Sequence, residues 1–363
     1  MTPNNFWVRK LALPLRNDEV FVKSGSPRRL IVEVMNNRSL DRIAALIDTN
    51  QGKIYKEIRM IPSLVADLPF ASLEELARSR YVYRIWQDSP VYAQLDVAVP
   101  TSGGLVPYQA GLTGRSVVIA VLDTGIDTHE DLTKPTNRIL AWKDLVNQEE
   151  SPYDDNGHGT HVAGIIAGNG SYSNGKYRGM APEAMLVGVK TLDEEGSGRL
   201  SDVIAAIEWC IDSLSALNIR VINLSIGSEV QESYRTDPLC RVSSVAWEKG
   251  ITVCAAAGNS GPKPRTINTP GINPAIITVG NLDDQNTLTN IDDMLAPSSS
   301  RGPTLDSFIK PDLVAPGTNI TSLKVGGGYT TLSGTSMAAP LVTGAYAGRA
   351  GRCAVHEPSR RGK

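Results

Sequence analysis

The sequence has few cysteines and few histidines, four of each among 363 residues. None of the cysteines belongs to a Cys-x-x-Cys pair, and cysteines this sparse are consistent with a reducing compartment. Cys254 lies inside an apolar run, where a buried thiol is its expected role. Two of the four histidines stand close together in one glycine-rich motif, which makes that motif a candidate functional site.

An excess of charge of one sign is also lacking, because 36 basic residues nearly balance 38 acidic ones, for a net charge of −2. This balance favours neither a nucleic acid nor a membrane as a partner. Residues 1–16 lack the apolar segment of a signal peptide, and no run is long enough to span a membrane, so we expect a cytoplasmic protein. The composition, 41% apolar and 20% charged, is that of a globular protein with room for two domains.

The first hundred residues show patterns typical of a small α+β domain. Strands are predicted at 30–35, 54–61, 65–68 and 81–86, and helices at 40–47 and 73–77. The order β-α-β-β-α-β is that of a ferredoxin-like domain. We place this domain at 27–99, after an N-terminal extension at 1–26. Its last residues, from 88, are expected to be extended, and a Pro/Ser/Gly cluster marks a linker at 100–110.

The rest of the chain alternates between strand and helix patterns. Continuous apolar runs, typical of strands buried on both faces, occur at 117–122, 185–189, 221–226, 251–257 and 276–279. Helical stretches are predicted at 158–167, 200–217 and 239–249. This alternation predicts an α/β fold with a parallel sheet and helices on both of its faces. In such sheets the active site lies beyond the carboxyl ends of the strands.

Three polar residues stand in positions that suit catalysis. Asp123 directly follows the first buried strand, His158 lies between two glycines, and Ser336 lies among small residues at the start of a helical run. Serine needs a base to remove its proton, and a carboxylate holds that base in the right tautomer. Each residue also has a structural interpretation, Asp123 as a turn or cap residue and Ser336 as a helix N-cap.

Two further interpretations concern the same motifs. His158 and His161 have a spacing that a metal could use, but no Glu lies between them and the His-Glu-x-x-His pattern is absent. Asn259 follows another buried strand, where its amide could donate to an oxyanion, or where it could simply form a turn. A lipase-type hydrolase is disfavoured because Gly-x-Ser-x-Gly is absent at Ser336.

Taken together, the segments around these four residues resemble the subtilases, the subtilisin-like serine peptidases, and among them the intracellular AprX-like branch. The resemblance extends over 111–345 and implies a subtilisin-like serine endopeptidase that works through an acyl-enzyme intermediate. It implies that Asp123 orients His158, that His158 is general base and then general acid, and that Ser336 attacks the peptide carbonyl. Asn259 and the Ser336 backbone N–H would hold the oxyanion.

The resemblance also implies a cleft for polypeptide substrates. One edge that pairs with an extended peptide would be Gly196, Ser197 and Gly198. The cleft would further be lined by Leu224, Ser225, Ile226 and Gly227 on one side, and by Ala256, Ala257 and Gly258 on the other. Simple turn chemistry is the alternative explanation for each of the glycines. The absence of bulky charge on these walls predicts an apolar or aromatic side chain at the substrate position P1.

By the same resemblance, the N-terminal domain is a propeptide that assists folding and caps the cleft with residues 92–99. A cut within 95–105 would release it, so that the enzyme is made as a self-inhibited precursor. Two alternatives remain: a permanent regulatory domain, and a catalytically impaired protein whose prodomain stays docked. The second alternative is motivated by residues 346–363, an atypical, truncated-looking tail without the amphipathic period needed to cover the sheet.

Calcium is common in subtilases, although no cofactor is required for the chemistry. Asp154-Asp155, Asp283-Asp284 and Asp292-Asp293 are carboxylate pairs with the oxygen ligands that calcium prefers. Such pairs are more often turn or cap residues, and the sequence assigns no metal ligands.

Overall fold

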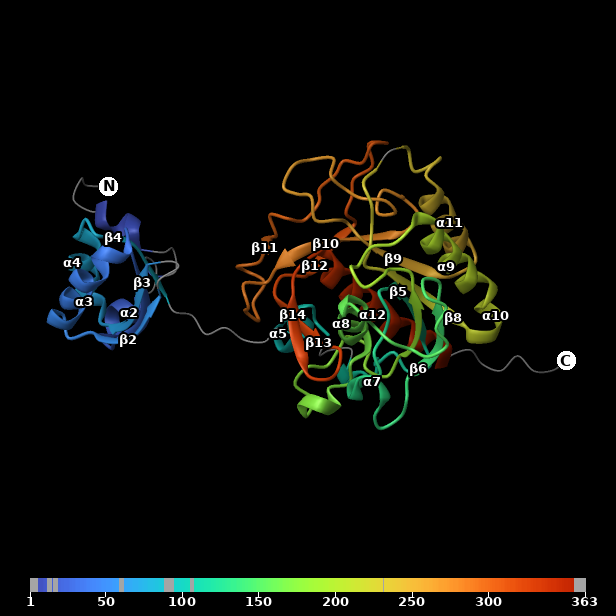
Figure 1. Ribbon diagram of the computed structural model, residues 1–363, viewed down its shortest axis with the longest axis horizontal. Helices are drawn as coiled ribbons and strands as arrows, with labels where there is room; N and C mark the ends of the chain where they lie inside the picture. The colour runs from blue at the N-terminus through green and yellow to red at the C-terminus, as the bar shows by residue number, and fades with distance from the viewer. Residues whose placement is uncertain are drawn as a thin grey trace. The chain divides into compact units, whose positions relative to one another are not determined.

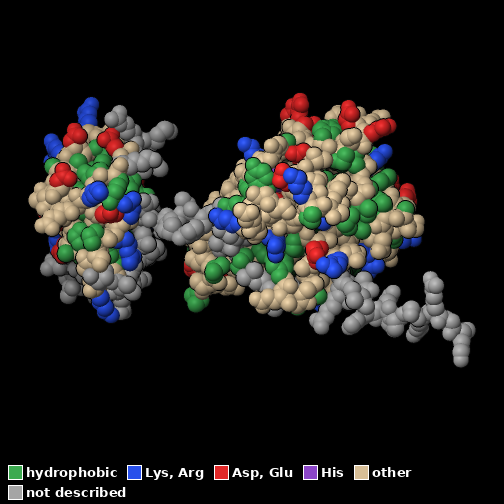
Figure 2. Space-filling model, turned by 90° about the horizontal axis from the view of Figure 1, so that it is seen from below, with side chains coloured by type: hydrophobic (Ala, Val, Ile, Leu, Met, Phe, Trp, Pro, Cys, Tyr) green, Lys and Arg blue, Asp and Glu red, His purple; other side chains and the backbone are tan. Residues whose placement is uncertain are grey.

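The computed structural model describes residues 6–11, 15, 19–58, 62–87, 95–104, 108–230 and 232–355. It divides the chain into two compact units, Met1–Val91 and Tyr92–Lys363 (Figure 1). Among the described residues, no helix combines the length and the apolar character that crossing a membrane requires. Basic and acidic side chains are both spread over the face shown in Figure 2.

The first unit is built on a four-stranded antiparallel sheet in the order β2-β3-β1-β4. Its strands are β1 (Arg28–Val34), β2 (Lys53–Ile58), β3 (Ser63–Leu68) and β4 (Val82–Gln87). The longest described helix of this unit is α3 (Leu40–Thr49). The shorter ones are α4 (Leu73–Arg78), α2 (Glu19–Ser24), η1 (Phe6–Lys10), η2 (Asn37–Ser39) and η3 (Phe70–Ser72). The order β-α-β-β-α-β is therefore the one predicted, although residues 59–61 of the second predicted strand lie outside the described residues.

Two expectations about the edges of this unit were wrong. The extension at 1–26 is not separate, because Leu11, Leu15 and Phe21 are buried in the same core as the sheet. At the other end, residues 95–101 are not an extended tail leading into a linker but a helix, α5 (Leu95–Thr101). Ala98 and Val99 of α5 are buried in the core of the second unit, so burial of these side chains fixes the helix there. The rest of the predicted tail, 88–94, lies outside the described residues.

The second unit contains an eight-stranded sheet in the order β11-β10-β9-β8-β5-β7-β6, with β12 also paired to β10. Every pair is parallel except that of β10 with β11. The strands are β5 (Val118–Asp123), β6 (Ile139–Asp144), β7 (Met185–Lys190), β8 (Ile219–Leu224), β9 (Thr252–Ala256), β10 (Ile277–Asp283), β11 (Met294–Leu295) and β12 (Leu313–Pro316). β13 (Ile320–Leu323) and β14 (Tyr329–Leu332) form a separate hairpin. All six residues of β5 are buried, as its continuous apolar run predicts.

Helices cover both faces of this sheet, which confirms the predicted α/β fold. One core cluster contains side chains of α8 (His158–Ala167) and α12 (Thr335–Val355). The cluster on the other face contains side chains of α9 (Leu200–Asp212) and α11 (Pro238–Glu248), which Figure 1 shows side by side. Shorter helices are α7 (Glu130–Thr133), α10 (Leu214–Leu217) and η4 (Ser171–Ser173).

Helix α12 continues past residue 345, where the resemblance was expected to stop. It reaches Val355, and Ala347 is fully buried in the core. Glycine makes this close packing feasible, since a Cβ atom on Gly344 would lie 2.6 Å from the Cβ of Met180. The expectation that residues beyond 345 cannot cover the sheet is therefore wrong for the first of them. Residues 356–363 lie outside the described residues.

Candidate active site

Asp123 and His158 are joined by a short hydrogen bond. Asp123 is the last residue of β5 and is fully buried, and its Oδ1 lies 2.7 Å from Nδ1 of His158. His158 is the first residue of α8, and α8 packs tightly against the chain after β5. That approach requires glycine at 159, because a Cβ atom there would lie 2.2 Å from the Gly125 carbonyl oxygen. The fold thus brings the carboxyl end of a buried strand against the start of a helix.

The electrostatics of this pair favour a charged imidazole. Burial by itself lowers the pKa of His158, but the charge of Asp123 and the hydrogen bond to it outweigh burial, and the pKa is raised above its ordinary value. The His158 side chain keeps 25% of its surface exposed, so its ring is accessible from the cleft. A ring whose Nδ1–H donates to Asp123 has its Nε2 free to accept a proton.

Ser336 lies in the first turn of α12, at the same cleft as His158. Its Oγ donates a hydrogen bond of 2.9 Å to the backbone carbonyl of Ser225, and the Ser225 hydroxyl donates one of 2.9 Å to the backbone carbonyl of Ser336. Between these described residues there is no hydrogen bond from Ser336 Oγ to His158. Catalytic hydrogen bonds often tighten only when a substrate is bound, so this geometry is compatible with a nucleophile and its base.

Asn259 is oriented by a residue that sequence reasoning missed. Its Oδ1 accepts hydrogen bonds from the Thr335 backbone N–H at 2.9 Å and from the Thr335 hydroxyl at 3.1 Å. Its Nδ2 is then the group left to donate, and Asn259 lines the cleft together with Ser336. Thr335 directly precedes Ser336 at a helix start, so a search for a capping hydroxyl would have found it.

Thr124 and Lys190, which sequence reasoning also missed, form hydrogen bonds with backbone groups next to Asp123 and His158. The Thr124 hydroxyl donates to Asp154 Oδ1 and accepts from the Gly159 N–H, both at 2.9 Å. Lys190, at the carboxyl end of β7, is fully buried and donates to the Thr124 carbonyl at 2.6 Å and to Asp155 Oδ1 at 2.5 Å. A charged residue that ends a buried apolar strand is the signal that singled out Asp123, and it also applies to Lys190.

This network assigns Asp154-Asp155 a structural role. Asp154 Oδ1 also accepts from the backbone N–H groups of Asn156 and Gly157, and its Oδ2 accepts from Thr160. Over the described part of the chain, no three His, Cys, Asp or Glu side chains gather into a group that could hold a metal ion.

The cleft has a volume of about 740 Å³ and contains most of the residues predicted to line it. Those that line it are Gly196, Ser197, Gly198, Ser225, Ile226, Gly227, Ala256 and Gly258, together with His158, Asn259 and Ser336. Leu224 and Ala257 do not, because both side chains are fully buried in hydrophobic clusters behind the cleft. Glu195 and Arg199 flank the 196–198 segment, so the cleft as a whole is not free of charge.

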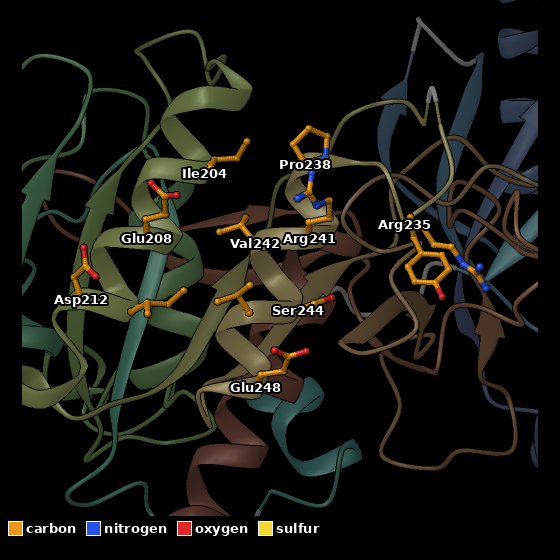
Figure 3. A pocket seen from close by; sticks show the side chains of 12 residues that line it. Ile204, Glu208, Asp212, Arg235, Pro238, Arg241, Val242, Ser244 and Glu248 are labelled. Carbon is orange, nitrogen blue, oxygen red and sulfur yellow. The ribbon is translucent and has the colours of Figure 1, made fainter.

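Another hollow lies between α9 and α11, away from these residues (Figure 3). Its walls carry both charged and apolar side chains, including Glu208, Arg241, Glu248, Ile204 and Val242. None of its lining residues is a histidine or a cysteine. It therefore lacks the histidine that pairs with a serine nucleophile, and the cleft at Ser336 is the better candidate active site.

Comparison with known proteins identifies the family of this chain. Residues 114–349 match the model of the family described as "Subtilase family". The chain belongs to the subtilase family. This confirms the resemblance inferred from the motifs, and it makes the chain a serine endopeptidase of the subtilisin-like class.

Individual relatives of this subtilase include two proteins of Bacillus subtilis (strain 168). Serine protease AprX is 44% identical in an alignment 297 residues long that covers 76% of this chain and 66% of AprX. Subtilisin E is 34% identical in an alignment 336 residues long that covers 90% of this chain and 81% of subtilisin E. Among solved structures, S41 psychrophilic protease is 38% identical with a TM-score of 0.56, covering 67% of this chain and 79% of that one.

Proposed function

We propose that this subtilase hydrolyses peptide bonds through an acyl-enzyme formed on Ser336. His158 takes the proton of Ser336 Oγ as the hydroxyl attacks the carbonyl, and it later gives that proton to the leaving amine. Asp123 keeps Nδ1 of His158 protonated and stabilises the imidazolium that forms. The observation that supports this proposal is the 2.7 Å Asp123–His158 hydrogen bond at a cleft that also contains Ser336.

The oxyanion of the tetrahedral intermediate needs hydrogen-bond donors in the same cleft. We assign this role to Nδ2 of Asn259 and to the backbone N–H of Ser336. The Ser336 N–H lies in the first turn of α12, where backbone N–H groups have no partner within the helix. The positive end of the helix dipole adds to the stabilisation of the negative charge.

The substrate class follows from the shape of the cleft walls. An extended polypeptide would lie along Gly196, Ser197 and Gly198 and pair with this segment as an added strand. Ala256 and Gly258 would form an uncharged wall of the P1 pocket, which favours an apolar or aromatic P1 side chain. Glu195 and Arg199 would then contact substrate residues other than P1.

A serine-directed fluorophosphonate probe tests the nucleophile. The wild-type chain should be labelled, and Ser336→Ala should not. Ser228→Ala is the matched control, because Ser228 is exposed in the same cleft and has no proposed role in the chemistry. Equal labelling of wild type and Ser336→Ala, or loss of labelling in Ser228→Ala, would reject Ser336 as the nucleophile.

We further propose that the first unit is a propeptide and that the chain is made as a self-inhibited precursor. The first unit has a core of its own, as a propeptide that assists folding requires. Since Ala98 and Val99 of α5 are buried in the second unit, we move the processing site from 95–105 to a position before Leu95. Incubation of the wild-type chain should release a fragment of about 90 residues by mass, and Ser336→Ala should stay intact. A wild-type chain that stays intact would instead favour the impaired protein with a docked prodomain.

A further inference from the structure

Pro340 follows Ser336 by four residues in α12 and removes a hydrogen bond from the start of that helix. In a regular helix each carbonyl accepts from the N–H of the fourth following residue, but proline has no N–H and its ring crowds that carbonyl. The Ser336 carbonyl therefore needs another donor. The hydroxyl of Ser225, which directly follows β8, supplies it at 2.9 Å. At this carbonyl the backbone of the proposed nucleophile is thus held by the sheet and not by its own helix.

Two fully buried side chains, Asn223 and Thr343, continue this contact into the core. Nδ2 of Asn223 donates to Ser225 Oγ at 2.9 Å, and the Thr343 hydroxyl donates to Asn223 Oδ1 at 2.7 Å. Asn223 belongs to β8, and Thr343 lies about two turns after Ser336 in α12. The chain of hydrogen bonds therefore leaves α12 at Thr343, passes through β8 and returns to α12 at the Ser336 carbonyl.

Pro340 also sets the direction of each hydrogen bond in this chain. A carbonyl can only accept, so the single hydroxyl hydrogen of Ser225 is used on Ser336. Ser225 Oγ can then only accept from Asn223, which turns the amide nitrogen of Asn223 toward Ser225 and its oxygen toward Thr343. Thr343 must in turn donate. The orientation of the Ser225 hydroxyl therefore depends on a threonine that does not contact it.

The position of Asn223 in the sheet indicates a role beyond packing. It lies between Ile222 and Leu224 in the buried part of β8, where an amide is costly unless its donor and acceptor are both bonded. Apolar residues are the usual occupants of such a strand and need no partner. Both ends of the Asn223 amide are bonded, and a buried polar network that is fully satisfied fixes one arrangement of its members. Here the arrangement that is fixed ends at Ser336.

We propose that Asn223 and Thr343 are positioning residues for the nucleophile. They hold the Ser225 hydroxyl on the Ser336 carbonyl and so fix the backbone from which Ser336 Oγ projects. This inference rests on the proposed function, because the two residues have this role only if Ser336 attacks the substrate. A displacement of about 1 Å near a reacting group can cost roughly 10²-fold in rate. Loss of the chain should therefore lower kcat with little change in KM.

Thr343→Val tests the proposal, because it keeps the volume of the side chain and removes the hydroxyl that orients Asn223. In the processed enzyme, kcat and the rate of fluorophosphonate labelling should each fall about tenfold, with KM nearly unchanged. Thr343→Ser keeps the hydroxyl and should restore both rates. All rates are measured well below the melting temperature of each variant, so that unfolded chain does not contribute.

Thr278→Val is the matched control. Thr278 is also fully buried, and its hydroxyl donates to the Gly271 carbonyl at 2.8 Å, but neither of these residues lines the cleft. Like Thr343→Val, this change leaves a buried acceptor without its donor, so the melting temperature should fall in both variants. In Thr278→Val, kcat should stay within about twofold of wild type, because the lost hydrogen bond does not lead to Ser336.

A double-mutant cycle separates positioning from a general effect on stability. Ser225→Ala removes the hydroxyl through which Thr343 acts and should lower kcat by itself. In that background, Thr343→Val should lower the melting temperature further and leave kcat unchanged within about twofold. If Thr343→Val lowers kcat equally in both backgrounds, it acts by another route and the proposal is wrong.

Asn223→Ala removes the central link and should lower kcat at least as much as Thr343→Val. Should Asn223→Ala fail to fold, the Thr343 variants and the cycle still decide the question. A wild-type kcat in Thr343→Val would overturn the proposal and leave the proposed function intact. A wild-type chain that is neither labelled nor able to hydrolyse peptides would instead reject the proposed function, and this inference with it.

Discussion

Thr335 holds the side-chain oxygen of Asn259 with two hydrogen bonds, from its backbone N–H at 2.9 Å and from its hydroxyl at 3.1 Å. This contact decides which end of the Asn259 amide faces the cleft. With Oδ1 occupied, the donor end is the one available to an oxyanion. The geometry therefore links the proposed oxyanion donor, Asn259, to the residue that directly precedes the proposed nucleophile, Ser336.

Asn259→Ala should lower kcat by about 10²–10³-fold with little change in KM, because the interaction is made mainly in the transition state. Steady-state hydrolysis of a peptide substrate by the processed enzyme measures both constants. A rise in KM at constant kcat would show that Asn259 binds substrate and does not stabilise the oxyanion.

Thr335→Val should lower kcat by about tenfold, because the Asn259 amide loses one of the two contacts that orient it. The same change leaves the Gly258 N–H without its acceptor, the Thr335 hydroxyl at 3.2 Å, so the melting temperature should also fall. Thr335→Ser keeps the hydroxyl and should restore kcat. If Ser and Val variants have the same kcat, the hydroxyl does not orient Asn259.

The pH dependence of activity should report His158. The imidazole must be neutral to accept the proton of Ser336, so kcat/KM falls as pH drops through the pKa of His158. Because Asp123 raises this pKa, the acid limb should have its midpoint above the ordinary value for histidine. In Asp123→Asn the midpoint should move to lower pH, and kcat should fall by about 10⁴-fold. An unchanged midpoint would show that another group controls the acid limb.

His161 should instead control stability in acid. Its ring is fully buried, Nε2 lies 3.0 Å from the Ile320 carbonyl, and burial lowers its pKa to about 4. The folded chain thus keeps His161 neutral while the unfolded chain protonates it near its ordinary pKa of about 6.5. The His161 contribution to the free energy of unfolding is therefore fully present above a pH of about 6.5. It decreases by roughly 3 kcal/mol as the pH falls toward 4. Urea unfolding of Ser336→Ala at several pH values measures this loss, and His161→Gln should flatten it.

Much of the second unit could be predicted because its central strands, among them β5, β7 and β9, are almost entirely buried and so read as continuous apolar runs. Strands β6, β11 and β12 have exposed residues and were not predicted. The hydrogen bond between Asp123 and His158 was anticipated from their motifs, whereas their catalytic roles stay predictions. Leu224 and Ala257 were assigned to the cleft because every residue of each family motif was assumed to line it. Both side chains are buried in the core, and a motif does not show which of its residues face the cleft.

Contacts between distant segments account for what the sequence did not reveal. Helix α5 was interpreted as tail and linker, because it contains Pro100 and is followed by serine and glycine. Its described buried side chains, Ala98 and Val99, lie in a core formed by distant segments. Leu11, Leu15 and Phe21 were likewise too sparse to show a pattern, yet they complete the core of the first unit. The role of such residues depends on partners that no local pattern identifies.

Lys190 is a fully buried charged residue next to the candidate active site. Its Nζ holds the Thr124 carbonyl, and Thr124 follows Asp123 directly, so Lys190 acts as a positioning residue. Lys190→Met keeps the volume but leaves that carbonyl and Asp155 without their partner, so kcat should fall about tenfold with KM nearly unchanged. The rate of fluorophosphonate labelling should fall in parallel.

Asp155→Asn is the matched control, since it keeps Lys190 and its bond to the Thr124 carbonyl while removing the ion pair. It should lower the melting temperature and leave kcat within about twofold of wild type, because Asp155 is partly exposed and does not contact Asp123. If Lys190→Met lowers the melting temperature but leaves kcat and labelling unchanged, the buried ammonium stabilises the fold without positioning Asp123. A parallel loss of kcat in both variants would instead assign the effect to the ion pair itself.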